Sequence, residues 1–85
     1  MRLDLRYFAW VRERLGTGEE TVDLPETVTD GAGLLAWLAA RDEANEAAFG
    51  EPRALRIAYD KRQVELDAPL SGVREVAVYP PMTGG

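Results

Sequence analysis

The sequence predicts an α+β fold in which one main helix packs across a mixed β-sheet. Five short segments alternate apolar and polar residues, which is typical of half-buried strands. A longer segment between the second and third of them carries an apolar stripe at helical spacing. Because one helix covers only one face of a sheet, a doubly wound α/β architecture is excluded.

The N-terminal segments predict a strand, a helical turn and a second strand. Residues 2–7 alternate strictly between charged and apolar side chains, so we expect a half-buried first strand. Over residues 8–15 the apolar spacing lengthens to four and Gly16 follows as a stop, which predicts a short helical turn. Alternation resumes over residues 20–24 and ends at Pro25, giving a second strand able to pair antiparallel with the first.

The main helix is expected to begin with Thr29 as its N-cap and Asp30 in its first turn, where a negative charge suits the helix dipole. Its apolar stripe covers residues 34–39, and the helix is expected to end near residue 41 or 42. Two glycines in the first turn each cost up to about 1 kcal/mol relative to alanine.

The rest of the chain predicts a loop followed by three strands. Residues 43–53 are mostly polar, and we interpret them as a surface loop in which Phe49 is a lone anchor. Strands are predicted over residues 55–59 and 64–66, and a final strand ends at Tyr79.

These elements fit together compactly when the first and last strands lie side by side and parallel, joined through a right-handed crossover. That arrangement is the β-grasp, or ubiquitin-like, fold. We expect one such domain over residues 1–79 and an extended tail over residues 80–85. The side chains expected to line the core are Leu3, Leu5, Val22, Leu24, Leu34, Leu38, Ile57, Val64, Leu66, Val76 and Val78.

Composition excludes several classes of function. The 85 residues include no Cys and no His, which argues against disulfides, thiol nucleophiles, histidine bases and ordinary zinc sites, and no metal is expected. A formal charge of −5 argues against nucleic acid or an anionic membrane as partner and favours a basic protein surface. Without an apolar run of about 18 residues or a basic leader, a cytoplasmic location is the expectation.

The Glu19-Glu20 pair resembles the paired carboxylates of a hydrolase in composition only. Adjacent residues of a strand point to opposite faces, so the two carboxylates are not expected to share a site. We predict that both are solvated strand charges.

The last six residues, Pro80-Pro81-Met82-Thr83-Gly84-Gly85, are the candidate functional segment. Neither proline has an N–H to donate to a sheet, and each biases the residue before it toward extended geometry. We therefore expect a stiff tail that reaches at most about 20 Å from the domain. Gly84 and Gly85 lack a Cβ, so this backbone fits a narrow channel.

No side chain after Tyr79 carries a charge, so the C-terminal carboxylate of Gly85 would enter such a channel as the only charge on the tail. A frayed terminus is the simpler alternative, because chain ends are often poorly ordered. The combination of a strand, two prolines and a diglycine end favours Gly85 as the functional group.

This C-terminal run resembles that of the small, sulfur-carrying subunit of molybdopterin synthase, the MoaD family. The N-terminal run Tyr7-Phe8-Ala9-Trp10-Val11-Arg12-Glu13, followed by Leu15-Gly16, is similar to that family's opening strand and turn. With residues 55–70 the resemblance spans most of the chain. A diglycine end is shared with ubiquitin-like proteins and thiazole-pathway carriers, whereas Pro-Pro-Met-Thr-Gly-Gly is more specific.

The resemblance implies the same β-grasp fold and a chemical role for Gly85. In the family, a ubiquitin-activating-type adenylyltransferase uses ATP and Mg²⁺ to adenylate the terminal glycine, and a sulfur donor protein converts it to a thiocarboxylate. The sulfur then passes to cyclic pyranopterin monophosphate on the large catalytic subunit, within a heterotetramer. The chain is thus expected to be non-catalytic on its own and to hold no permanent cofactor.

The resemblance also implies a docking surface. Phe8 and Tyr79 match aromatic positions that meet the large subunit, Arg12 matches a basic position near them, and Pro80, Pro81, Met82 and Thr83 belong to the inserted tail. From the residues alone, Phe8, Trp10 and Tyr79 suit core or edge packing about as well as partner contact.

Two positions depart from the family pattern. Gln63 stands where an apolar residue is common, so this interface is expected to be more polar, and Asp60 replaces an Asn-type turn residue. The alternatives are a thiazole-pathway sulfur carrier, a modifier joined through Gly85 to lysines of other proteins, and a plain interaction module.

Overall fold

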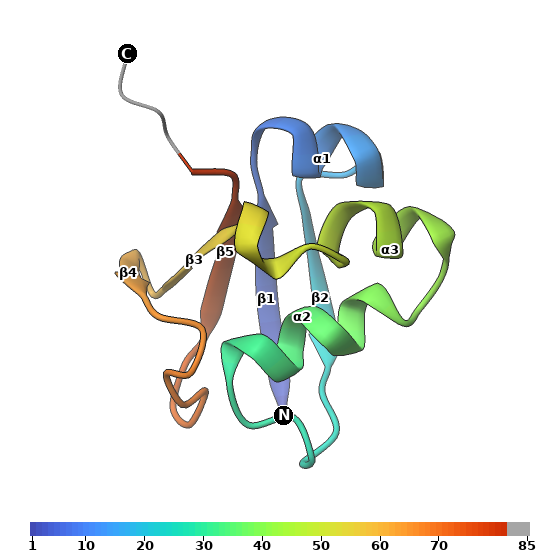
Figure 1. Cartoon of the computed structure of the whole chain (residues 1–85). Coiled ribbons are helices and arrows are strands. Elements are labelled where there is room, and N and C mark those ends of the chain that lie inside the picture. Colours follow the sequence, from blue (N-terminus) through green and yellow to red (C-terminus); the bar gives the residue numbers. More distant parts are fainter. Residues whose placement is uncertain (82–85) are drawn as a thin grey trace.

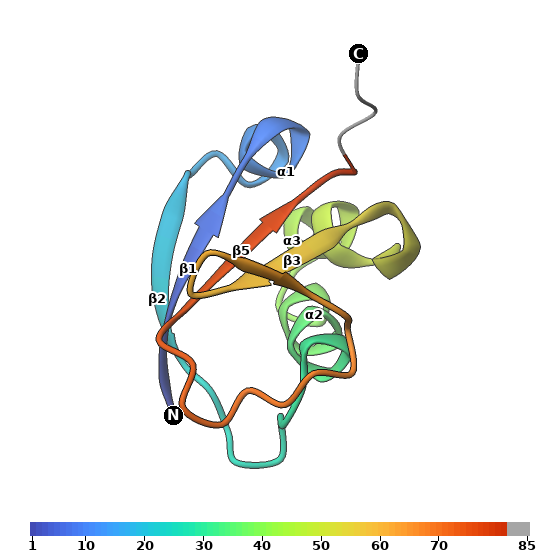
Figure 2. The same cartoon turned by 90° about the vertical axis from the view of Figure 1, so that its left-hand side faces the viewer.

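The computed structural model describes residues 1–81 and contains a mixed β-sheet with helices packed on one face (Figures 1 and 2). Its strands are β1 (Arg2–Tyr7), β2 (Glu19–Asp23), β3 (Arg56–Tyr59), β4 (Arg62–Val64) and β5 (Glu75–Tyr79). Its helices are α1 (Ala9–Leu15), α2 (Gly31–Ala39), α3 (Glu43–Phe49) and the 3₁₀ turn η1 (Pro52–Ala54). In this part of the chain no helix has the length and apolar character needed to cross a membrane.

The strand order β2-β1-β5-β3-β4 places β1 and β5 at the centre of the sheet, where they pair in parallel. Their register aligns Leu5 with Val76 and Tyr7 with Val78. All other neighbouring strands are antiparallel. The predicted β-grasp topology is therefore confirmed. β2 begins one residue earlier, and β4 two residues earlier, than the sequence predicted.

The core lies between the sheet and the helices. Strict alternation in β1 buries its apolar face completely, as predicted. Val64 and Leu66, expected in the core, are only half-buried, because β4 is a short edge strand and Leu66 lies beyond its end. Buried hydrophobic residues absent from the expected set are Tyr7, Val11, Leu35, Ala48, Phe49, Leu55, Ala58, Tyr59 and Leu70.

The start of α2 differs from the prediction by one residue. Asp30, not Thr29, is the N-cap: its backbone is extended and its Oδ1 accepts a hydrogen bond from the Gly33 amide at 2.8 Å. Gly31 then packs so closely under β3 that a Cβ there would overlap Ile57 Cδ1. The cost of a helical glycine is therefore offset by close approach of α2 to the sheet.

The surface loop predicted for residues 43–53 is wrong, because this segment forms α3 and η1. Asp42 caps α3 by accepting from the Asn45 amide at 2.8 Å. Phe49 is almost completely buried, with its ring centroid 5.6 Å from that of Tyr7 in β1. A helix of this length draws its stability from tertiary packing, which explains why its short sequence, with only one large apolar side chain, did not predict it.

Candidate functional site

The root of the candidate tail is the end of the central strand β5. Hydrogen-bonded neighbours flank β5 on both sides, so Tyr79 is held in place up to the strand's last residue. β5 ends next to α1, at the opposite end of the molecule from the N-terminus (Figure 1). Pro80 is half-buried and Pro81 is exposed. The predicted site residues Met82, Thr83, Gly84 and Gly85 lie outside the described residues.

Phe8 and Tyr79 lie side by side at this root. Tyr7 is the register partner of Val78 in the parallel pair, so the residues that follow them, Phe8 and Tyr79, align on the outer face of the sheet. The Phe8 amide donates to the Val78 carbonyl at 3.2 Å. Phe8 is 45% exposed, which is unusual for a large apolar side chain in this domain. Ala9 follows at φ 54°, a left-handed conformation that costs a residue with a Cβ about 1–2 kcal/mol.

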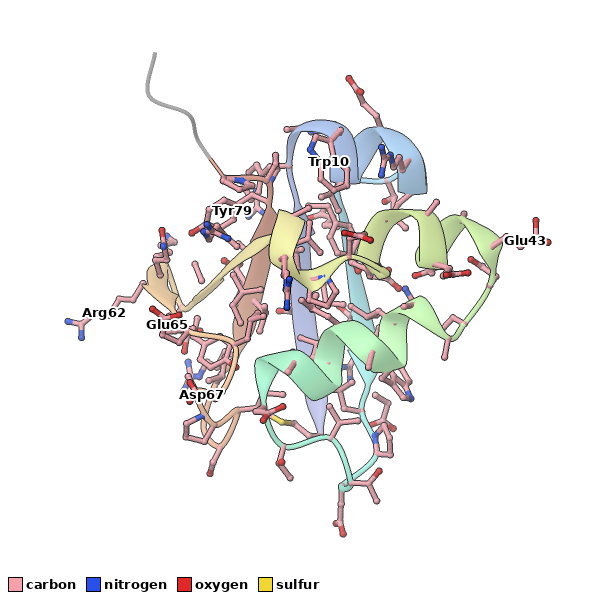
Figure 3. All side chains as sticks on the ribbon, viewed as in Figure 1. Trp10, Glu43, Arg62, Glu65, Asp67 and Tyr79 are labelled. Carbon is pink, nitrogen blue, oxygen red and sulfur yellow. The ribbon has the colours of Figure 1, made fainter. Side chains whose placement is uncertain are left out.

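Tyr79 connects the root to the neighbouring hairpin of β3 and β4. Its hydroxyl donates to Gln63 Oε1 at 3.2 Å. Arg56, the first residue of β3, is its cross-strand partner. Figure 3 shows Tyr79 at the end of β5, close to where the described chain stops. Gln63 led us to expect a more polar docking surface. The hydroxyl of Tyr79 belongs to the same polar group.

The other two N-terminal candidates lie on α1. Arg12 is exposed, and its guanidinium packs against Gly18 in the turn before β2. Trp10 is half-buried against the core, and the Arg14 guanidinium lies over its ring, with Cζ 4.3 Å from the centroid. For Trp10 these contacts favour the packing role over partner contact.

The carboxylates of Glu19 and Glu20 lie in different environments, as the alternation of a strand requires. We predicted that both are solvated charges, but only Glu19 is exposed. Glu20 is half-buried and accepts two hydrogen bonds from Arg41, both at 2.9 Å, and one from the Tyr7 hydroxyl at 2.7 Å. Hydrogen bonding from Arg41 is the main cause that lowers the pKa of Glu20. Burial, with the hydrogen bond to Glu20, raises the pKa of the Tyr7 hydroxyl. The cluster joins β1 and β2 to the end of α2.

Replacing Glu20 with Gln is expected to destabilise the protein in a pH-dependent way. Because the pKa of Glu20 is lower in the folded state, its contribution is fully present above the ordinary value near 4.5 and is lost as the pH falls through the folded value. We expect a cost of about 1 kcal/mol at neutral pH for this partly exposed group. Urea unfolding at neutral pH and at about pH 3 measures it. Glu19→Gln is the matched control, and an equal loss in both variants would contradict the prediction.

Asp60 does more than the turn chemistry that the sequence indicated. Asp60 and Lys61 have φ of 48° and 75° and form the two-residue turn between β3 and β4. The Asp60 carboxylate also accepts from the amides of Arg74 and Glu75, with Oδ1 distances of 3.2 and 3.0 Å. It therefore anchors the start of β5, the strand that carries the tail. Within residues 1–81 no group of three acidic, Cys or His side chains is placed to hold a metal ion.

Comparisons with known proteins agree with this geometry. The model of the ThiS family matches residues 5–85. A curated relative, the molybdopterin synthase sulfur carrier subunit of Mycosarcoma maydis, is 35% identical over 83 residues, which cover 93% of this chain and 88% of the relative.

Solved structures share the fold. In the complex of subunits 1 and 2 of the molybdopterin-converting factor from Helicobacter pylori, the matching chain is 22% identical with a TM-score of 0.64, and both chains are covered completely. Small archaeal modifier protein 1 of Haloferax volcanii is 19% identical with a TM-score of 0.61, over 95% of this chain and 98% of that one.

Proposed function

The chain belongs to the ThiS family, and on that premise we propose that it is the sulfur carrier subunit of a molybdopterin synthase. The observation that carries the proposal is the identity with the curated subunit from Mycosarcoma maydis, which extends along nearly the whole of both chains. The exposed Phe8 and the half-buried Tyr79 at the root of the Pro-Pro-Met-Thr-Gly-Gly run support it, because the chain then offers a docking surface and a transferable end together.

The chemistry takes place at Gly85. A free carboxylate is a poor electrophile, and the chain has no cysteine or histidine with which to activate it. An adenylyltransferase of the ubiquitin-activating type therefore uses ATP and Mg²⁺ to form an acyl-adenylate at Gly85, with release of pyrophosphate. Attack by hydrosulfide, supplied by a sulfur donor, on the acyl carbon then displaces AMP, releases a proton and leaves a thiocarboxylate.

The thiocarboxylate sulfur bonds to cyclic pyranopterin monophosphate on the large subunit, and water then hydrolyses the resulting thioester, so that the sulfur stays on the pterin and Gly85 returns to a carboxylate. One chain carries one sulfur, so a dithiolene, which contains two, consumes two loaded chains. The contribution of this chain is to bind and to position. The paired strands hold Tyr79, and Pro80-Pro81 limit the directions in which the tail leaves the sheet.

Reconstitution tests the proposal. The purified chain is incubated with a cognate activating enzyme, ATP, Mg²⁺ and sulfide, and intact-mass analysis follows the exchange of one oxygen for sulfur. The loaded chain is then mixed with the large subunit and cyclic pyranopterin monophosphate. We expect dithiolene product, and no gain by thiazole synthase from the same loaded chain. Isopeptide adducts on lysines without any pterin product would instead favour a protein modifier.

Tyr79→Ala is expected to weaken binding of the large subunit by about 1–3 kcal/mol, because aromatic side chains at the centre of an interface carry much of its binding energy. Isothermal titration calorimetry with the purified large subunit measures the loss. Tyr79→Phe is the control, since it retains the ring and removes only the hydrogen bond to Gln63. Unchanged affinity of Tyr79→Ala, at unchanged thermal stability, would assign Tyr79 to edge packing alone.

A further inference from the structure

We propose that the surface beside the tail root, formed by Arg53, Arg56 and Gln63, docks against a carboxylate-bearing surface of the large subunit. The proposal rests on the proposed function and adds the chemistry of the partner's face. The net charge of this acidic chain led us to expect a basic partner surface, whereas the proposal places an acidic surface of the partner here.

Arg56 lies next to Tyr79, one of the two aromatic residues at the tail root. It is the register partner of Tyr79 in the antiparallel pair of β3 and β5, so the two side chains share the outer face of the sheet. Directly opposite residues in such a pair have Cβ atoms about 4.5–5.5 Å apart. Arg56 is exposed, and its Nη1 donates to the Leu55 carbonyl at 3.0 Å, which restrains the guanidinium at this edge.

A groove of about 290 Å³ between η1 and β4 extends this surface. Arg53 and Arg56 line it together with Gln63, and Glu65 is the single acidic side chain in the lining. Among residues 1–81, no carboxylate lies within 4.0 Å of either arginine. The two guanidinium groups are thus available to a partner that covers the groove.

One group of acidic residues lies away from this surface. Asp42, Glu43 and Glu46 surround the start of α3, and Figure 3 shows Glu43 on the far side of the molecule from Tyr79. A large subunit that covers Tyr79 would also cover Arg56, its cross-strand neighbour. Covering a guanidinium without a counter-charge is costly, so the complementary partner presents carboxylates there. The hydrogen bond between Tyr79 and Gln63 gives the same surface a polar centre.

Charge reversal at Arg56 tests this inference. The association rate and affinity of the large subunit are measured by stopped-flow fluorescence and calorimetry at low and high salt, for the wild type and for Arg56→Glu. We expect the association rate of Arg56→Glu to fall about tenfold at low salt, and the salt dependence of binding to weaken. Arg2→Glu is the matched control and should bind like the wild type. It makes the same change in net charge, but at the end of β1 that lies away from the tail root.

Equal or tighter binding by Arg56→Glu, or an equal loss in Arg2→Glu, would overturn the inference, since the partner face would then be neutral, basic or sensitive only to total charge. Circular dichroism checks the fold of each variant. If Arg56→Glu fails to fold, Arg53→Glu, which lies outside the sheet, takes its place with the same expected outcome. Absence of binding by the wild type would instead refute the proposed function.

Discussion

Removal of Gly85 is expected to abolish sulfur loading completely. Under the proposed function, the acyl carbon that an activating enzyme adenylates belongs to this residue, and deletion moves the terminal carboxylate one residue, about 3.3 Å, back along the tail. A displacement of about 1 Å is enough to cost a factor of about 100 in a reaction that depends on alignment. Intact-mass analysis after incubation with activating enzyme, ATP and sulfide gives the readout.

The truncated chain should remain folded, because every buried apolar residue of the described domain precedes Pro80. Its thermal midpoint is therefore expected to equal that of the full chain. A truncated chain that still gains sulfur would place the reactive group elsewhere, and one that loses stability would show that the tail contributes to the fold.

Phe49→Ala is expected to destabilise the domain by about 3–5 kcal/mol, the usual cost of removing a fully buried aromatic ring. The ring is 1% exposed and fixes α3 against Tyr7 of β1. In a domain of this size, such a loss lowers the thermal midpoint by roughly 10 °C or more. Calorimetry or urea unfolding measures the change.

Phe8→Ala is the matched control, since it removes the same ring from an exposed position. Its stability should change by no more than about 0.5 kcal/mol, while binding of the large subunit weakens. If Phe49→Ala were as stable as Phe8→Ala, α3 would be a peripheral element after all, as the sequence first suggested.

The family and most of the sheet were predictable from the sequence because both depend on local signals. The MoaD resemblance was carried by short runs at the two ends of the chain, and the family match confirms it. Strict alternation identified β1 and β5, since burial on one face imposes a period of two. The role of Arg56 had no such signal, because its neighbour Tyr79 lies 23 positions further along the chain and only the pairing of β3 with β5 brings them together.

The sequence by itself therefore determined the elements that a local pattern identifies. These are the alternating strands, the apolar stripe of α2 and the Pro-Pro-Met-Thr-Gly-Gly run without charged side chains. Only the tertiary structure decided that residues 43–49 form a helix, that Glu20 is tied to Arg41, and that a basic surface borders the tail root of an acidic protein. The reason is physical. The stability of a short helix, the pairing of a half-buried carboxylate and the local electrostatic potential all depend on groups distant in sequence. Composition and periodicity do not record such groups.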